Sequence, residues 1–117
     1  MTTSEHATAK AALDEERANL VHQLSELGAN EQGELRDDVD FGEGFADAAA
    51  ATAERTEVLG LVESLKRMLD DVDAALERIA EGEYGICREC GKQIGAARME
   101  FRPESTLCVE CKAAKAH

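Results

Sequence analysis

The chain has 117 residues and a formal net charge of −12, with 13 lysines and arginines against 25 aspartates and glutamates. This balance excludes the basic footprint of a nucleic-acid binder, and no apolar run is long enough to cross a membrane. With one tyrosine and three phenylalanines, the chain cannot build a thick core. It needs a stripe of apolar contacts between helices and an additional stabilising element such as a metal ion.

The first predicted element is a helix over residues 4–28. Its apolar residues follow one another in steps of seven, four and three: Leu13, Leu20, Leu24 and Leu27. This spacing places them on one face of an α-helix, and the five alanines nearby favour the helical state. Gly28 is expected to end the helix, because glycine readily takes the left-handed conformation found at helix C-termini.

Two histidines in this region are not expected to bind a metal. His22 lies beside the leucine stripe and is interpreted as a partly exposed surface residue, because four cysteines elsewhere already complete a metal site. His6 lies close to the N-terminus, where disorder is expected. The first residues contain no apolar run resembling a signal peptide, so we expect a cytoplasmic protein.

An acidic loop is predicted for residues 28–46, where glycines interrupt any regular period. Acidic side chains crowd this stretch beside a single base, Arg36. The simplest interpretation is a solvated loop. Phe41 and Phe45, half of the aromatic residues of the chain, favour an additional role, either packing under the loop or anchoring a partner.

A second, longer helix is predicted for residues 47–82. Its apolar residues alternate in steps of four and three, which is a sustained heptad seam: Val58, Val62, Leu65, Leu69, Val72, Leu76 and Ile79. Asp47 can cap the start of this helix, and Gly82 is expected to end it.

The two apolar stripes predict a mainly α fold. We expect residues 1–82 to form an antiparallel, coiled-coil-like hairpin with the acidic loop at its distal tip. A coiled coil between two chains is the alternative, but the turn-rich insert between the stripes favours pairing within one monomeric chain. Residues 83–117 are expected to form a small four-cysteine zinc finger that ends in a short helix.

The four cysteines of the chain form two C-x2-C pairs in this last region, Cys87 with Cys90 and Cys108 with Cys111. Each pair can place two thiolates on one tight turn, and two such turns make the tetrahedral four-sulfur cage that Zn2+ accepts. Gly91 follows the first pair and allows positive φ in that turn. Disulfides suit secreted domains and a redox C-x-x-C usually comes singly, so we expect one structural zinc ion.

The run GEYGICRECGKQIGAARMEFRPESTLCVECK resembles the zinc-finger signature of the DksA/TraR family. The likeness covers about residues 43–112, including the long helix that leads into the finger. It implies a bacterial regulator that binds RNA polymerase directly and modulates transcription initiation without contacting DNA. The tip of the helical hairpin would enter the secondary channel of the polymerase, and the four cysteines match the zinc ligands of the family.

The same resemblance points to a partner-binding tip. The tip pattern of the family, D-x-x-D-x-A, falls on residues 44–49, where Asp47 and Ala49 match and Gly44 replaces the first aspartate. Phe45 lies within this pattern. The resemblance therefore implies that Asp47, Ala49 and Phe45 act on the polymerase.

The resemblance also implies weak candidates for a guanosine tetraphosphate site. Arg98, Arg102 and Lys112 match three of its basic positions, although Arg98 and Arg102 can equally be ordinary surface residues. The fourth basic position holds Asp71, and a carboxylate repels a polyphosphate.

These features can be compared with three classes of function. A polymerase-binding transcription regulator is the principal hypothesis, and a structural zinc-finger adaptor for another protein partner is the alternative. An enzyme is not expected, because no His, Ser or carboxylate constellation lies beside an open metal site.

Overall fold

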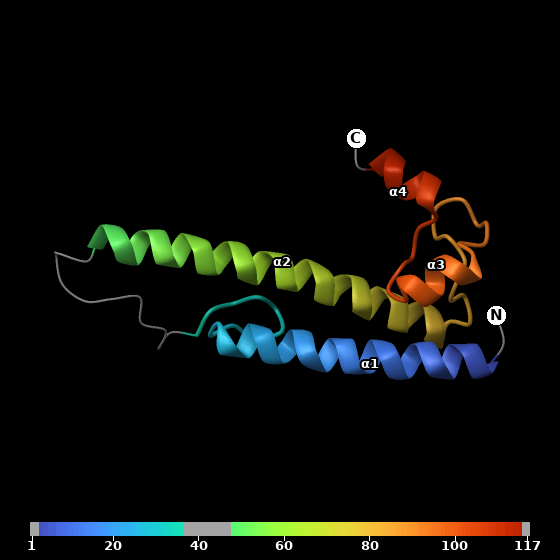
Figure 1. Cartoon of the computed structure of the whole chain (residues 1–117), viewed down its shortest axis with the longest axis horizontal. Coiled ribbons are helices and arrows are strands. Elements are labelled where there is room, and N and C mark those ends of the chain that lie inside the picture. Colours follow the sequence, from blue (N-terminus) through green and yellow to red (C-terminus); the bar gives the residue numbers. More distant parts are fainter. Residues whose placement is uncertain (1–2, 37–47, 116–117) are drawn as a thin grey trace. The chain divides into compact units, whose positions relative to one another are not determined.

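The computed structural model describes residues 3–36 and 48–115. Within these ranges the chain forms four helices (Figure 1): α1 (Thr3–Glu26), α2 (Ala48–Ala80), α3 (Ala96–Phe101) and α4 (Val109–Lys115). The described segments contain no strand, only two isolated antiparallel bridges. None of the helices combines the length and apolar character needed to cross a membrane. The predicted fold class, a helical hairpin followed by a four-cysteine finger, is confirmed.

The chain packs as two compact units. One, here called the finger unit, combines Met1–Arg17 with Asp70–His117; the other, the hairpin unit, is Ala18–Leu69. Helices α1 and α2 both contribute segments to each unit. The predicted helix limits were 4–28 and 47–82, so each observed helix ends two residues earlier than expected.

The hairpin unit buries one stripe from each long helix. Leu20 and Leu24 of α1 and Val62 and Leu69 of α2 are all at most 3% exposed. Leu27, Val58 and Leu65 are only half-buried, so they flank the seam. The stripes of both helices are thus buried within a single chain, as pairing within one chain requires.

The finger unit buries its own residues of the two long helices. Leu13 of α1 and Val72 and Ala75 of α2 have no exposed surface. Burying one leucine side chain contributes about 2 kcal/mol. Beside these residues, the Arg17 guanidinium donates to the Asp73 carboxylate at 2.8 Å, which links α1 to α2.

Glycines end both long helices through the same hydrogen-bond pattern. After α1, Gly28 N donates to Ser25 O at 3.0 Å and the next amide, Ala29 N, donates to Leu24 O at 2.8 Å. After α2, Gly82 N and Glu83 N repeat the two bonds at 3.1 and 2.9 Å. Gly28 and Gly82 have φ of 85° and 76°, as this Schellman geometry requires. The predicted stops at Gly28 and Gly82 are confirmed.

The first part of the predicted acidic loop is ordered. Residues 28–36 form a narrow turn in which Ala29 and Leu35 make an antiparallel bridge. The side-chain oxygen of Asn30 accepts hydrogen bonds from the amides of Gln32 at 3.0 Å and Glu34 at 2.9 Å. Residues 28–36 are thus an ordered turn whose backbone is organised by an asparagine side chain, while most of their side chains stay exposed, as expected of a solvated loop. Phe41, Phe45 and Asp47 lie outside the described residues.

Candidate metal centre and basic pocket

The linker after α2 positions the first pair of cysteines. Arg78, in the last turn of α2, donates to Glu83 Oε2 at 2.6 Å and to the Ile86 carbonyl at 2.9 Å. The hydroxyl of buried Tyr84 donates to the Pro103 carbonyl at 2.8 Å, which ties the linker to the chain between the cysteine pairs. These bonds fix the direction in which the linker reaches Cys87.

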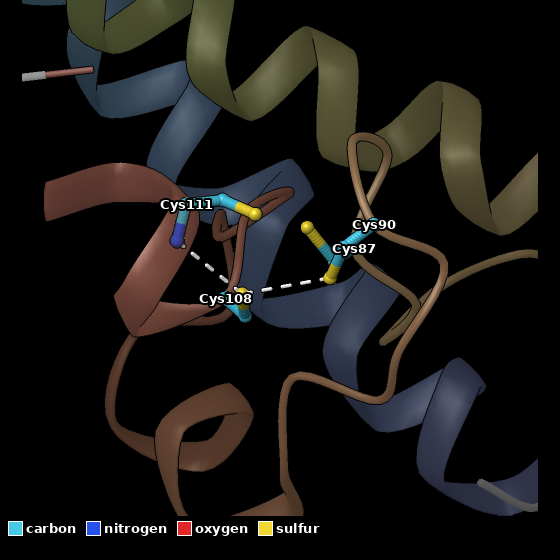
Figure 2. Close-up of side chains that lie close together, drawn as sticks. All are labelled: Cys87, Cys90, Cys108 and Cys111. Atoms are coloured by element: carbon cyan, nitrogen blue, oxygen red, sulfur yellow. Dashed lines mark hydrogen bonds between the residues drawn. The ribbon is translucent and has the colours of Figure 1, made fainter. Parts of the chain in front are cut away.

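The first pair lies on a tight turn. Cys87 N donates to Lys92 O at 2.8 Å, and Gly91 N donates to Cys87 O at 3.0 Å. Gly91 has φ of 74°, so the positive φ predicted there is confirmed. The turn brings Cys87 and Cys90 to the same side of the backbone (Figure 2).

The second pair uses a helix start instead of a loop. Cys108 directly precedes α4 and Cys111 lies in its first turn, where Cys111 N lies 3.4 Å from Cys108 Sγ. Contacts of neighbouring residues also join the two cysteine segments: Arg88 N donates to Thr106 O at 3.0 Å, and Lys115 Nζ lies 2.9 Å from Glu89 Oε1. The predicted short helix at the end of the chain is thus present.

The four sulfur atoms converge on one point (Figure 2). All of them lie within 4.8 Å of one another, and Cys90 Sγ is 3.8 Å from Cys108 Sγ. A tetrahedral zinc site with Zn–S bonds of about 2.3 Å has S–S edges of about 3.8 Å. The spacing and the all-sulfur donor set therefore fit a closed zinc site with no open position for a substrate.

The electrostatics of the four cysteine thiols also fit a bound cation. Backbone hydrogen bonds from Cys90 and Cys108 lower the pKa of the Cys87 thiol to about 6. Hydrogen bonds with the side chains of Cys108 and Cys87 raise the pKa of the Cys111 thiol to about 12. Four thiolates this close repel one another, and a divalent cation would remove that conflict.

A second site gathers the predicted nucleotide-binding residues. Arg98, Arg102 and Lys112 line one pocket of about 80 Å³, here called the basic pocket. Asp71 of α2 lines the same pocket, so the basic residues and the carboxylate implied by the resemblance do lie together. Arg88, which the sequence did not single out, is a fourth basic side chain there.

The predicted tip is only partly described. Asp47 and Phe45 lie outside the described residues, whereas Ala49 is the second residue of α2. Their part in partner binding therefore stays a prediction.

The histidines show one correct and one wrong expectation. His22 is an exposed surface residue, with Nε2 3.1 Å from Glu26 Oε1. His6 is not disordered: it lies in α1, half-buried, with its ring edge-on to Tyr84 at a centroid distance of 5.5 Å. The expectation failed because it considered only distance from the terminus, whereas Tyr84, far along the chain, provides the contact.

Helix α3 was also missed. Its six residues follow Gly95 and include alanine, arginine, methionine and glutamate, all good helix formers. Their propensity was the available signal, but a helix of this length is too short to show a period. Met99 is its one buried residue, and Arg98 reaches the basic pocket from it.

Comparison with known sequences finds a family profile that matches the finger and curated relatives that match part of the chain. The sequence profile described as the prokaryotic dksA/traR C4-type zinc finger matches residues 82–116. The RNA polymerase-binding transcription factor DksA of Caulobacter vibrioides is 37% identical over 68 residues, which are 58% of this chain and 48% of that protein. The chain thus spans about half the length of this curated relative.

Two solved structures resemble the whole chain. The transcription factor DksA2 from Pseudomonas aeruginosa has a TM-score of 0.79 and 36% identity, covering 99% of this chain and 86% of that one. The Dks protein from Chlamydia trachomatis has a TM-score of 0.63 and 24% identity, covering 99% and 92%. The second likeness supports the fold alone.

Proposed function

The chain belongs to the DksA/TraR family, and from this membership we propose that it is a transcription regulator that binds bacterial RNA polymerase directly. The observation that carries the proposal is the 36% identity to a transcription factor of the family across 86% of its length. The Caulobacter relative is likewise named as an RNA polymerase-binding transcription factor.

Zinc has a structural role in this proposal. One ion would be held by Cys87, Cys90, Cys108 and Cys111, whose sulfurs lie close enough to share it. Four thiolates leave no coordination position for a substrate. The zinc would therefore stabilise the finger without taking part in a reaction, and the protein would not be an enzyme.

The hairpin would carry the effect on transcription. Its tip, with Asp47, Ala49 and Phe45, would enter the secondary channel and modulate initiation. The formal net charge of −12 argues against DNA contact and would steer the protein toward a basic channel. The protein would act as a monomer in the cytoplasm, where its partner is found.

Asp47 provides the sharpest test of this role. Asp47→Ala should abolish the effect in an in-vitro transcription assay while polymerase affinity stays within about tenfold, or about 1.4 kcal/mol. Asp47→Asn is the matched control, because asparagine caps a helix as well as aspartate but carries no charge. If Asp47→Asn keeps full activity while Asp47→Ala loses it, Asp47 is a helix cap and the functional role fails.

The alternative is a zinc-finger adaptor for another protein. A pull-down with purified core RNA polymerase separates the two, using the zinc-loaded chain and a truncated chain without residues 83–117. Retention of the zinc-loaded chain supports the regulator. No retention of the zinc-loaded chain would leave the adaptor as the better description.

A further inference from the structure

The finger unit contains a cavity of about 260 Å³ that shares no lining residue with the sulfur cluster or the basic pocket. Segments far apart in the sequence form its walls. They are the start of α1 with His6, the linker after α2 with Tyr84 and Ile86, and the start of α3 with Met99. The cavity therefore exists only where the first turns of α1 meet the finger.

The floor of the cavity is buried and apolar, and no side chain of the described residues fills the space above its glycines. Tyr84 and Met99 are 4% and 2% exposed. The Tyr84 hydroxyl already donates to the Pro103 carbonyl at 2.8 Å, so Tyr84 offers the cavity its ring. A Cβ atom added to Gly82 or Gly95, which also line the cavity, would meet no described atom within 4 Å.

None of the nine lining residues is an aspartate, glutamate, lysine or arginine, although 32% of the chain is charged. A charged ligand would lose water here and find no opposite charge, which is costly. The polar side chains of the lining are the imidazole of His6 and the amide of Gln93. An apolar space with a few polar groups is typical of sites for neutral small molecules.

His6 supplies an unused hydrogen-bonding atom at the wall. Its ring packs edge-on to Tyr84 at a centroid distance of 5.5 Å, and its Nε2 atom is screened from solvent without a hydrogen-bond partner in the described part of the chain. A neutral imidazole has one acceptor nitrogen, and rotation about its χ2 bond is soft. A small turn of the ring would therefore present Nε2 to an N–H group in the cavity.

We propose that this cavity binds a small, neutral, flat molecule with two fused rings and one N–H group. An apolar cavity of about 150 Å³ holds one benzene ring, so 260 Å³ leaves room for a second ring. The rings would pack on Tyr84 and Met99, since aromatic and thioether groups both make favourable contacts with aromatic rings. The N–H group would donate to His6 Nε2. This proposal does not depend on polymerase binding.

The test titrates indole into the full-length, zinc-loaded, 15N-labelled chain and follows the amide resonances of Gly85 and Gly95, two lining residues. Both should shift and saturate with a Kd of about 1 mM or tighter. The matched ligand is 1-benzofuran, which has the same shape with oxygen in place of N–H. It should bind at least fivefold more weakly.

A ring-conserving variant isolates the hydrogen bond. His6→Phe keeps a ring against Tyr84 but removes the nitrogen, so indole should bind it no better than 1-benzofuran does. His22→Phe is the control, because His22 is an exposed histidine of the same helix that does not line the cavity. It should keep the preference for indole.

A second pair of variants locates the ligand. Ala96 lines the cavity and is exposed, so Ala96→Phe should fill the space and weaken indole binding at least tenfold. Ala97→Phe adds the same ring at an exposed neighbour that does not line the cavity, and its affinity should stay within twofold of wild type. Zinc content and circular dichroism should match wild type in both. Ala96→Leu replaces Ala96→Phe if that variant loses zinc.

Three outcomes would overturn the proposal. The first is the absence of saturable shifts at Gly85 and Gly95. The second is equal affinity of the wild type for indole and 1-benzofuran, which would remove the role of His6. The third is equal weakening by Ala96→Phe and Ala97→Phe, or by neither, which would place the ligand elsewhere.

Discussion

The hairpin unit and the finger unit are built in different ways. In its described residues, the hairpin unit has segments of two long helices and a short turn, and the side chains buried there are leucine, valine and alanine. The finger unit adds two short helices to such segments. Of these, α3 buries only Met99 and α4 buries none of its residues.

This difference indicates what stabilises each unit. Helices with a long apolar stripe can be held by burial alone, whereas short helices with one buried residue cannot. The finger compensates with hydrogen bonds from Arg78 and Tyr84 and with the sulfur cluster. A change aimed at metal binding and a change aimed at the buried leucines and valine of the hairpin unit should therefore affect different units.

The largest effect is expected from breaking the sulfur cluster. Cys108→Ser should abolish stable zinc binding, which contributes about 10–16 kcal/mol in small zinc domains. Residues 83–117 should become sensitive to protease, while the helical circular dichroism of α2 is largely kept, because its seam residues remain. Elemental analysis should give one zinc per wild-type chain and none for the variant.

Val109→Ser serves as the control for this experiment, because Val109 is adjacent and 59% exposed. It should keep its zinc and its protease resistance. A metal-free protein with a protease-resistant C-terminal third would contradict the distinction between the two units.

A smaller but still large effect is expected in the hairpin unit. Leu69 is 1% exposed, so Leu69→Asp should cost on the order of 4 kcal/mol. The thermal midpoint should fall by about 15 °C or more, with loss of helicity. Met68→Asp, at a residue 48% exposed, should change the midpoint by only a few degrees. An obligate dimer in ultracentrifugation, with helicity that falls on dilution, would contradict pairing within one chain.

The smallest effect concerns Tyr84, which sharpens the description of the finger unit. Burial, with a contribution from Glu104, raises the pKa of Tyr84 to about 12 from the usual 10.0. The folded protein holds this proton more tightly than the unfolded chain, so stability should fall as pH rises from about 10 to about 12.

Because Tyr84 is the only tyrosine and no tryptophan occurs, ultraviolet absorbance reports its ionisation directly. The folded protein should titrate near pH 12, and denatured protein near pH 10. Tyr84→Phe removes the bond to Pro103 and should cost about 1 kcal/mol. A folded-state midpoint near that of the denatured chain would show that Tyr84 is not shielded.

The sequence by itself determined the features that arise from neighbours along the chain. The spacing of Leu13, Leu20 and Leu24 specifies a helix face whatever lies opposite it. Gly28 and Gly82 end helices through bonds to the turn just before them. The two C-x2-C pairs are short motifs that already contain half a metal site each, so the cluster was predictable.

Features that depend on residues far apart in the sequence were decided only by the tertiary structure. The His6 ring contacts the ring of Tyr84, which lies far from it in the sequence. The resemblance singled out Asp71, Arg98 and Lys112, but the sequence could not show that Arg88 shares their pocket or that burial acts on Asp71. Helix α3 has too few residues to show a period in the sequence. Burial of Met99 in the finger unit holds it in place. Such contacts and burial arise only on folding, since packing brings together side chains that local spacing does not connect.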